Sequence, residues 1–203
     1  LAWMTNLYTF MDGADGLAGS MALVGFLAYG LAAMATHPQL GLVCFVLAAL
    51  ATGFLGFNLP AAKVFMGDAG SVPLGFLAGA LGVYGWKAGA WTVEFPLLVF
   101  LPFIGDATVT LGRRLVARDR VWQPHREHYY QRLIRLGWSH GRVLAAEAVF
   151  MVLTASSALM LEGLSELARV SIVGGWVGAM AIAMIWIDVR WRIARDLEGS
   201  SGR

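Results

Sequence analysis

The 203-residue sequence has little charge and a single cysteine. Only 14% of its residues are charged, against about 25% in an ordinary soluble domain, which excludes a soluble globular protein. With so few charges and so much apolar surface, a disordered chain is excluded as well. The lone Cys44 allows neither a disulfide framework nor a cysteine-based zinc site. A formal net charge of +2 is too small to indicate nucleic-acid binding.

Hydrophobic residues make up 58% of the chain and gather in six runs, most of them close to the length of a membrane-spanning helix. The linkers after the first, third and fifth runs are short, so neighbouring spans must be antiparallel. We therefore predict an all-α fold, a polytopic membrane helical domain of about six transmembrane helices in which residues 1–203 form one domain. The predicted spans are Gly16–Ala35, Leu40–Phe57, Val72–Trp86, Phe95–Gly112, Val143–Leu161 and Val170–Ile187.

Antiparallel spans bring three longer polar regions to one side of the membrane. These regions are Leu1–Asp15, Asn58–Ser71 and Arg113–Arg142, and the tail after Asp188 joins them. Thirteen of the fifteen Lys and Arg residues fall on this side. Because basic residues are retained in the cytoplasm during insertion, the pattern predicts cytoplasmic loops here.

Four acids, Asp12, Asp15, Asp68 and Asp106, lie at or near this same rim. Carboxylates are costly near hydrocarbon, so we expect a polar cavity, most simply one that holds a cation. In Met11–Gly16 and again in Phe65–Ser71, acids stand among glycines just before a predicted helix. Such helix starts offer N–H groups to phosphate, while the acid can hold a metal ion that bridges phosphate oxygens. The alternative is that each acid caps a helix or pairs with an Arg.

A basic segment, Pro124–Leu133, supplies the complementary charge through His125, Arg126 and His128. Clustered bases and imidazoles are expected where an anionic substrate binds at a membrane surface. Two alternatives are a metal site, which would need more ligands than are near, and a solvated basic loop without a ligand.

Three stretches together resemble the polyprenyl-phosphate N-acetylhexosamine-1-phosphate transferase family, also described as glycosyltransferase family 4. The matching residues are Asn6–Gly19, Pro60–Ser71, and Pro124–Leu133 with Gly137, Ser139 and His140. The resemblance implies a Mg²⁺-dependent phosphotransferase that moves N-acetylhexosamine 1-phosphate from a UDP-sugar to polyprenyl (undecaprenyl) phosphate and releases UMP. It also implies an initiating role in cell-wall or surface-polysaccharide (O-antigen-like) assembly, and a multi-pass protein of the bacterial inner membrane with its site facing the cytoplasm.

Carried over residue by residue, the resemblance makes Asp68 the catalytic acid that binds Mg²⁺. It makes Asp15 a uracil contact, Phe65 the ring that stacks on uracil, and Asp12 a polar contact near the nucleoside or sugar. His125 and His128 resemble the family's catalytic histidine motif near the phosphates and the sugar. We assign Lys63 and Arg126 to the anionic substrate from their charge. The implied partners are UDP-N-acetylhexosamine, polyprenyl phosphate and the lipid bilayer, with no nucleic acid; a homodimer is left open.

The sequence departs from the family pattern in two places. Thr9 stands where the family usually has Asn. The family's adjacent pair of acids, which lies N-terminal to the first motif, has no match here, and we therefore expect the chain to be the C-terminal portion of the enzyme.

Two other classes of membrane protein share features with this sequence. The CDP-alcohol phosphotransferases also begin a motif with Asp-Gly, but Asp12-Gly13 is followed by Ala14-Asp15-Gly16 and not by Ala-Arg. An ion-coupled transporter or a non-catalytic membrane subunit would also carry acids in a membrane domain. Against that class, these acids gather at one rim, and the sequence shows neither a charged site near mid-bilayer nor an inverted repeat.

Overall fold

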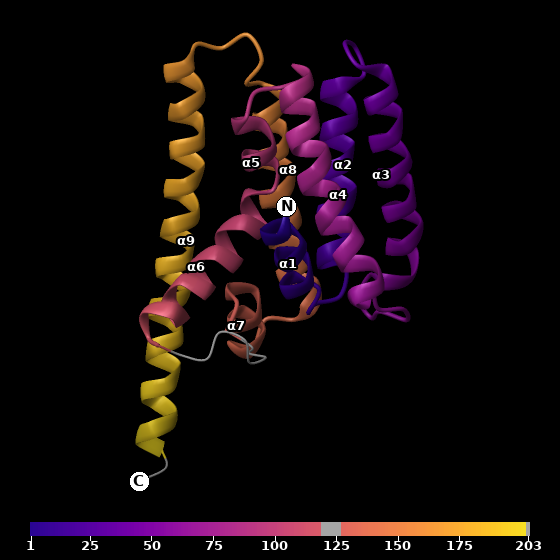
Figure 1. The fold of residues 1–203 in the computed structure, drawn as a ribbon. Helices are drawn as coiled ribbons and strands as arrows, with labels where there is room; N and C mark the ends of the chain where they lie inside the picture. The colour runs from indigo at the N-terminus through magenta and orange to yellow at the C-terminus, as the bar shows by residue number, and fades with distance from the viewer. Residues whose placement is uncertain (119–126, 202–203) are drawn as a thin grey trace.

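The protein is described by a computed structural model over residues 1–118 and 127–201, with side chains described to residue 197. Within those residues it has nine helices and no strand, so the predicted all-α fold is confirmed (Figure 1). The helices are α1 (Ala2–Met11), α2 (Leu17–Ala33), α3 (Pro38–Asn58), α4 (Gly67–Ala88), α5 (Glu94–Val99), α6 (Leu101–Val116), α7 (Tyr129–Arg135), α8 (His140–Leu159) and α9 (Glu166–Ser201).

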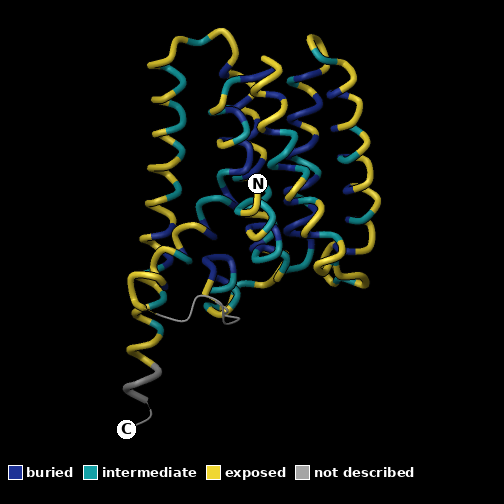
Figure 2. Tube along the Cα trace, viewed as in Figure 1, coloured by how far each residue is buried: buried dark blue, intermediate teal, exposed yellow. Residues whose placement is uncertain are grey.

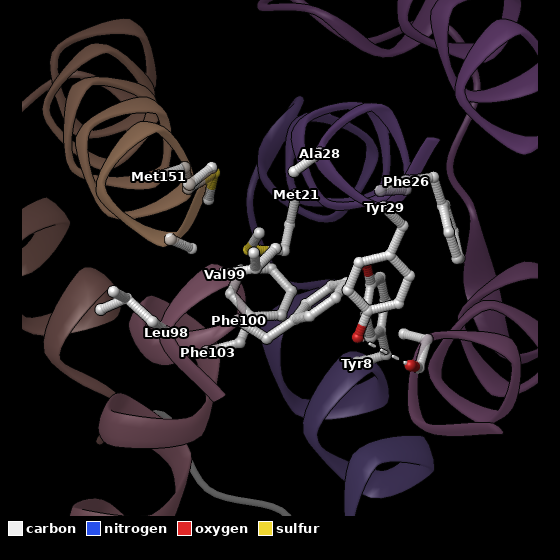
Figure 3. Close-up of a cluster of buried hydrophobic side chains, with 14 of the residues drawn as sticks. Tyr8, Met21, Phe26, Ala28, Tyr29, Leu98, Val99, Phe100, Phe103 and Met151 are labelled. Carbon is white, nitrogen blue, oxygen red and sulfur yellow. Dashed lines mark hydrogen bonds between the residues drawn. The ribbon is translucent and has the colours of Figure 1, made fainter. Parts of the chain in front are cut away.

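The core is built around α2, which packs against α3 and α8 and also touches α4 and α5. Met21, Phe26 and Tyr29 on this helix are almost completely buried (Figure 3). Their neighbours include Phe100, whose ring lies edge-on to that of Tyr29 at 5.6 Å between centroids. The Tyr29 hydroxyl donates to the carbonyl of Ala78 at 3.2 Å, so the buried phenol is satisfied where α2 meets α4.

Many positions on α3 and α9 are exposed (Figure 2), and a large share of the exposed residues on these helices are apolar. On α9, Leu167 and Ile182 are among the most exposed, as expected of a helix that faces lipid. Among the described residues, three helices are long and apolar enough to cross a membrane, with spans at Pro38–Asn58, His140–Leu159 and Glu166–Leu197. The shorter apolar helix Leu17–Ala33 accompanies them. The membrane domain is thus shown, whereas the number of spans stays a prediction.

The predicted span Phe95–Gly112 is wrong as one continuous helix, because the chain breaks at Phe100 into α5 and α6. Pro102 has no N–H to donate to a preceding turn, and proline fits best in the first turn of a helix. It occupies that place in α6. The break lets α6 leave the bundle direction and slope toward α9 (Figure 1).

The region Leu1–Asp15, expected to be a polar loop region, is helical over Ala2–Met11. The reason is an apolar face: Leu7, Tyr8 and Met11 recur at helical spacing and are fully buried. The helix packs against α4, where any side chain at Gly75 would collide with the α1 backbone. Short as it is, α1 fixes where the acidic loop after it begins.

The antiparallel order brings the loops of residues 12–16, 59–66 and 136–139 to one end of the bundle (Figure 1). The loops after α2, α4 and α8 lie at the other end, where Arg169 and Glu94 pair at 3.5 Å. We name the first end the acidic-loop face, after Asp12, Asp15 and Asp68. It is the end at which the sequence predicts the site.

Candidate functional site

The first acidic loop joins α1 to α2 and turns at Gly16. That residue has φ +76°, which side chains other than glycine rarely adopt. Its N–H donates to Oδ1 of Asn58 at 3.0 Å, and Asn58 is only 4% exposed. The same amide donates from Nδ2 to the Val64 carbonyl at 2.8 Å. One buried Asn therefore ties the acidic loop to the loop that precedes Asp68.

Asp15 lies between that second loop and the start of α8. Its Oδ2 accepts the N–H of Ala62 at 3.2 Å, and its Oδ1 is 3.9 Å from Nδ1 of His140. The carboxylate is held in place by a backbone donor while it keeps some exposure to solvent. This placement suits a side chain that accepts hydrogen bonds from a ligand.

Asp12 and Asp68 come together at the start of α4. Oδ2 of Asp12 accepts the N–H of Gly67 at 2.9 Å, and Gly67 has φ +58°. Asp68 is the next residue, exposed and in the first turn of α4. The pKa of Asp12 is raised to about 6. Burial is the largest cause, the Gly67 hydrogen bond opposes it, and the like charge of Asp68 adds to it. A hydrogen bond between residues 55 apart in the sequence thus brings the carboxylates of Asp12 and Asp68 into one small region.

This pair has the chemistry that a magnesium ion prefers. Mg²⁺ takes oxygen ligands and is commonly held by one or two carboxylates together with substrate phosphates. In the ranges 1–118 and 127–201, no group of three or more His, Cys, Asp or Glu side chains gathers closely enough to hold a metal ion. Asp12 and Asp68 therefore fit a cation whose coordination is completed by a phosphate ligand, and they do not fit a structural metal site.

Phe65 and Lys63 stand on the same loop as free, outward side chains. The ring of Phe65 is 74% exposed, the largest value for any aromatic residue among the exposed large hydrophobic residues described. Lys63 is also exposed, and its N–H donates to the Phe57 carbonyl at 2.8 Å, which holds the loop against the end of α3. An exposed aromatic ring beside a free ammonium group can stack on a base and attract a phosphate.

Asp106 on α6 is the most heavily bonded acid of the site. It is 3% exposed, and its Oδ1 accepts the Thr110 hydroxyl at 3.0 Å and Nδ1–H of His128 at 3.1 Å. The backbone N–H groups of Tyr129 and Tyr130 donate to its two oxygens at 3.0 and 3.2 Å. A single buried carboxylate therefore fixes both the start of α7 and the orientation of one imidazole.

His128 is buried, with 2% exposure, and its ring stacks between Phe10 and Tyr130 at centroid distances of 5.8 and 6.0 Å. The Tyr130 hydroxyl donates to the carbonyl of Phe10 at 3.1 Å. Phe10 lies two residues before Asp12. The structure thus packs His128 against Phe10, next to the acidic loop, and its catalytic role stays a prediction.

Comparison with known proteins adds the family. The sequence profile described as glycosyl transferase family 4 matches residues 1–86. The chain is 31% identical over 140 residues to the probable undecaprenyl-phosphate N-acetylglucosaminyl 1-phosphate transferase of Bacillus subtilis (strain 168), covering 68% of this chain and 39% of that protein. Over these ranges the chain is similar to glycosyl transferase family 4.

Two further members of the family show how the similarity is distributed. The decaprenyl-phosphate N-acetylglucosaminephosphotransferase of Mycobacterium tuberculosis (strain ATCC 25618 / H37Rv) is 30% identical over 163 residues, 70% of this chain and 40% of that protein. The phospho-N-acetylmuramoyl-pentapeptide-transferase of Picosynechococcus sp. (strain ATCC 27264 / PCC 7002 / PR-6) is 43% identical over 79 residues, 39% of this chain and 22% of that protein. The chain spans about two fifths of the length of the Bacillus and Mycobacterium proteins and 22% of the length of the Picosynechococcus protein.

Within the glycosyl transferase family 4 match lie five of the predicted site residues. The structure brings Asp12 next to Asp68 and places Asp15, Lys63 and Phe65 on the same two tied loops. His128 lies outside the matched range and contacts Phe10 and Tyr130 beside the acidic loop. The predicted residues His125 and Arg126 lie outside the described residues.

Two residues that organise this site were missed or left without a role by sequence reasoning. Asn58 was treated only as the first residue of the polar region Asn58–Ser71. Its position directly after an apolar run could have indicated a buried side chain that hydrogen-bonds two loops together. Asp106 was recognised as an intramembrane acid, but its partners were not foreseen. Asp106 binds His128 and the N–H groups of Tyr129 and Tyr130, and all three residues lie more than 20 positions after it in the sequence.

Proposed function

We propose that this chain carries the substrate site of an enzyme that transfers N-acetylhexosamine 1-phosphate from a UDP-sugar to a polyprenyl phosphate and releases UMP. The observation that supports it best is the hydrogen bond from Gly67 to Asp12. It joins the two acidic loops into one carboxylate pair inside the stretch that matches the family. Two of the relatives carry names that specify transfer onto undecaprenyl or decaprenyl phosphate.

The proposed reaction is a substitution at phosphorus. An oxygen of the polyprenyl phosphate attacks the β-phosphorus of the UDP-sugar, the bond from that phosphorus to the bridging oxygen breaks, and UMP leaves with the bond's electron pair. Both reactants are anions, so the protein must align them and offset their repulsion. A Mg²⁺ ion bound at Asp68 would supply positive charge for the diphosphate.

The chain's own residues divide the remaining tasks. Phe65 stacks on the uracil ring, and Asp15 accepts the imide N–H of the base. Lys63 attracts the diphosphate, and Asp12 keeps the acidic loop against Asp68. Asp106 and His128 hold α7 against Phe10, which fixes where that loop stands.

The proposal is tested with the protein expressed from its complete reading frame and reconstituted in lipid. UMP should form from UDP-N-acetylhexosamine only when polyprenyl phosphate is present, and no ion gradient should be needed. UDP-sugar uptake driven by a gradient, without UMP release, would identify a transporter and contradict the proposal.

Phe65→Ala should weaken binding of UDP and UMP, because it removes the stacking of the Phe65 ring on the base. Such stacking contributes about 1–3 kcal/mol to the binding free energy, or roughly 5- to 150-fold in Kd. Isothermal titration of the reconstituted protein measures this directly. Affinity for polyprenyl phosphate should stay nearly constant.

The matched control is Phe57→Ala, which removes another exposed ring, 61% exposed, at the end of α3. We expect nucleotide affinity to be unchanged in this variant. If Phe65→Ala weakens nucleotide and lipid equally, or if Phe57→Ala has the same effect, Phe65 is an interfacial anchor and not a base contact.

The acidic-loop face should lie in the cytoplasm. In a Cys44→Ser background, Ala62→Cys should resist an impermeant thiol reagent in intact cells and react once the cells are opened. Thr36→Cys, on the loop at the other end of the bundle, should react in intact cells. The reverse labelling pattern would move the proposed site away from cytoplasmic nucleotide sugars.

A further inference from the structure

A groove lies between α7 and the C-terminal part of α9, away from the carboxylate pair. It has a cavity volume of about 440 Å³ and is lined by Arg132, Arg135, Arg195 and Trp191, among others. Figure 1 shows α7 beside α9 at the acidic-loop end. The groove shares no described lining residue with Asp12, Asp15, Phe65 or Asp68.

The charges around the groove are unequally paired. Oδ1 of Asp188 forms ion pairs with both Arg113 and Arg132 at 2.7 Å. The positive charge of Arg132 is therefore paired with a carboxylate of the protein itself. Glu127, the carboxylate that lines the groove, is 3.8 Å from Arg114. Within the described residues, neither Arg135 nor Arg195 has a carboxylate partner. Two guanidinium groups are thus left to face the groove and its solvent.

Trp191 places this groove at the level where membrane meets water. The guanidinium of Arg135 stacks on its ring at 4.7 Å, which orients the Arg side chain over the groove. Tryptophan is enriched at bilayer interfaces, and Trp186 lies 1.4 turns earlier on the same helix. On its other face, α9 carries exposed apolar side chains, including Ile182, Ile185 and Val189, as expected of a helix in lipid. The cationic groove thus lies beside the end of a lipid-facing helix, at the depth of phospholipid headgroups.

We propose that this groove binds the phosphate group of an anionic membrane phospholipid in the leaflet on the side of the acidic-loop face. Guanidinium groups bind phosphate oxygens through paired hydrogen bonds, and basic groups near an anionic leaflet each add to the attraction. Arg135 and Arg195 hold the headgroup while the acyl chains of the lipid extend into the leaflet beside α9. The inference does not depend on the proposed transferase activity.

The test measures lipid binding to the purified full-length protein in detergent by native mass spectrometry. Phosphatidylglycerol should bind at least tenfold more tightly than phosphatidylcholine. The double variant Arg135→Gln/Arg195→Gln should lose most of that preference. The matched control, Arg190→Gln/Arg192→Gln, removes the same number of positive charges, both from α9, at residues that do not line the groove, and it should keep the preference.

Two outcomes would overturn the proposal. Equal losses in the two double variants would show diffuse attraction to the basic end of α9 and no defined site. A second arm adds inorganic phosphate or glycerol phosphate as a competitor. Displacement of phosphatidylglycerol at equimolar concentrations would show that the groove takes a soluble phosphate, whereas retention of the lipid supports the assignment to a membrane headgroup. Thermal unfolding of each variant confirms that it is folded, so a loss of binding is read only from folded protein.

Discussion

Asp68→Asn should reduce turnover by roughly 100-fold or more while leaving the protein folded in the membrane. A metal ion at a diphosphate supplies several kcal/mol of charge stabilisation in the transition state, and a neutral amide holds such an ion poorly. Asp68 is exposed, so its replacement leaves no buried group without a partner. The measurement is UMP release by reconstituted protein over a range of Mg²⁺ concentrations.

The control for this variant is Asp196→Asn, which removes an exposed acid from the tail of α9. It should keep the wild-type rate and the wild-type dependence on Mg²⁺. A wild-type rate in Asp68→Asn, with the control also unchanged, would sink the assignment of Asp68 as a metal ligand.

Asp106→Leu should destabilise the protein and stop turnover. The substitution leaves four donors without their acceptor, namely the N–H groups of Tyr129 and Tyr130, the Thr110 hydroxyl and His128 Nδ1. Removing the acceptor of a buried polar cluster while its donors remain lowers the free energy of unfolding by about 3–5 kcal/mol. Thermal unfolding in detergent measures the loss of stability.

Asp106→Asn separates positioning from simple destabilisation. Its side-chain oxygen can still accept the Tyr130 N–H in place of Oδ2, but its NH₂ group then replaces Oδ1 and cannot accept from His128 Nδ1–H or from the Tyr129 N–H. We expect a smaller loss of stability than in Asp106→Leu and a fall in kcat of at least tenfold, with a smaller change in KM for the UDP-sugar. Thr110→Val removes one of the four donors and should keep both rate and fold. Wild-type kcat in a folded Asp106→Asn variant would show that the orientation of His128 has no role in turnover.

Much of the fold followed from apolar runs of helical length. Helices α2, α3 and α8 match predicted spans closely because each run is bounded by a polar or glycine-containing turn. The break at Phe100 is a local backbone effect of Pro102, which averaging over an apolar window conceals. Helix α1 was missed because a ten-residue segment is too short to register as a span, and its stability comes from packing on α4.

The gathering of the acids on one face was predictable, whereas their individual partners were not. Alternation of spans is enough to bring Asp12, Asp15 and Asp68 to one end. The bond from Gly67 to Asp12, by contrast, depends on a positive φ at Gly67 and on how α1 leans on α4. Similarly, His128 was expected near the phosphates and the sugar because its segment resembles the family's histidine motif. Its burial against Phe10 depends on the course of α6, which the sequence pattern did not reveal.

The most direct test of the central claim follows the phosphorus atom. Reconstituted protein is given UDP-N-acetylglucosamine carrying ³²P in the β-phosphate and ¹⁴C in the sugar, together with undecaprenyl phosphate, and the lipid product is extracted. Transfer of a sugar 1-phosphate predicts that both labels enter the lipid in equal molar amounts and that unlabelled UMP is the nucleotide released. Lipid that carries ¹⁴C without ³²P, with labelled UDP left in solution, would contradict the account, because the bond broken would then be the one between sugar and phosphate.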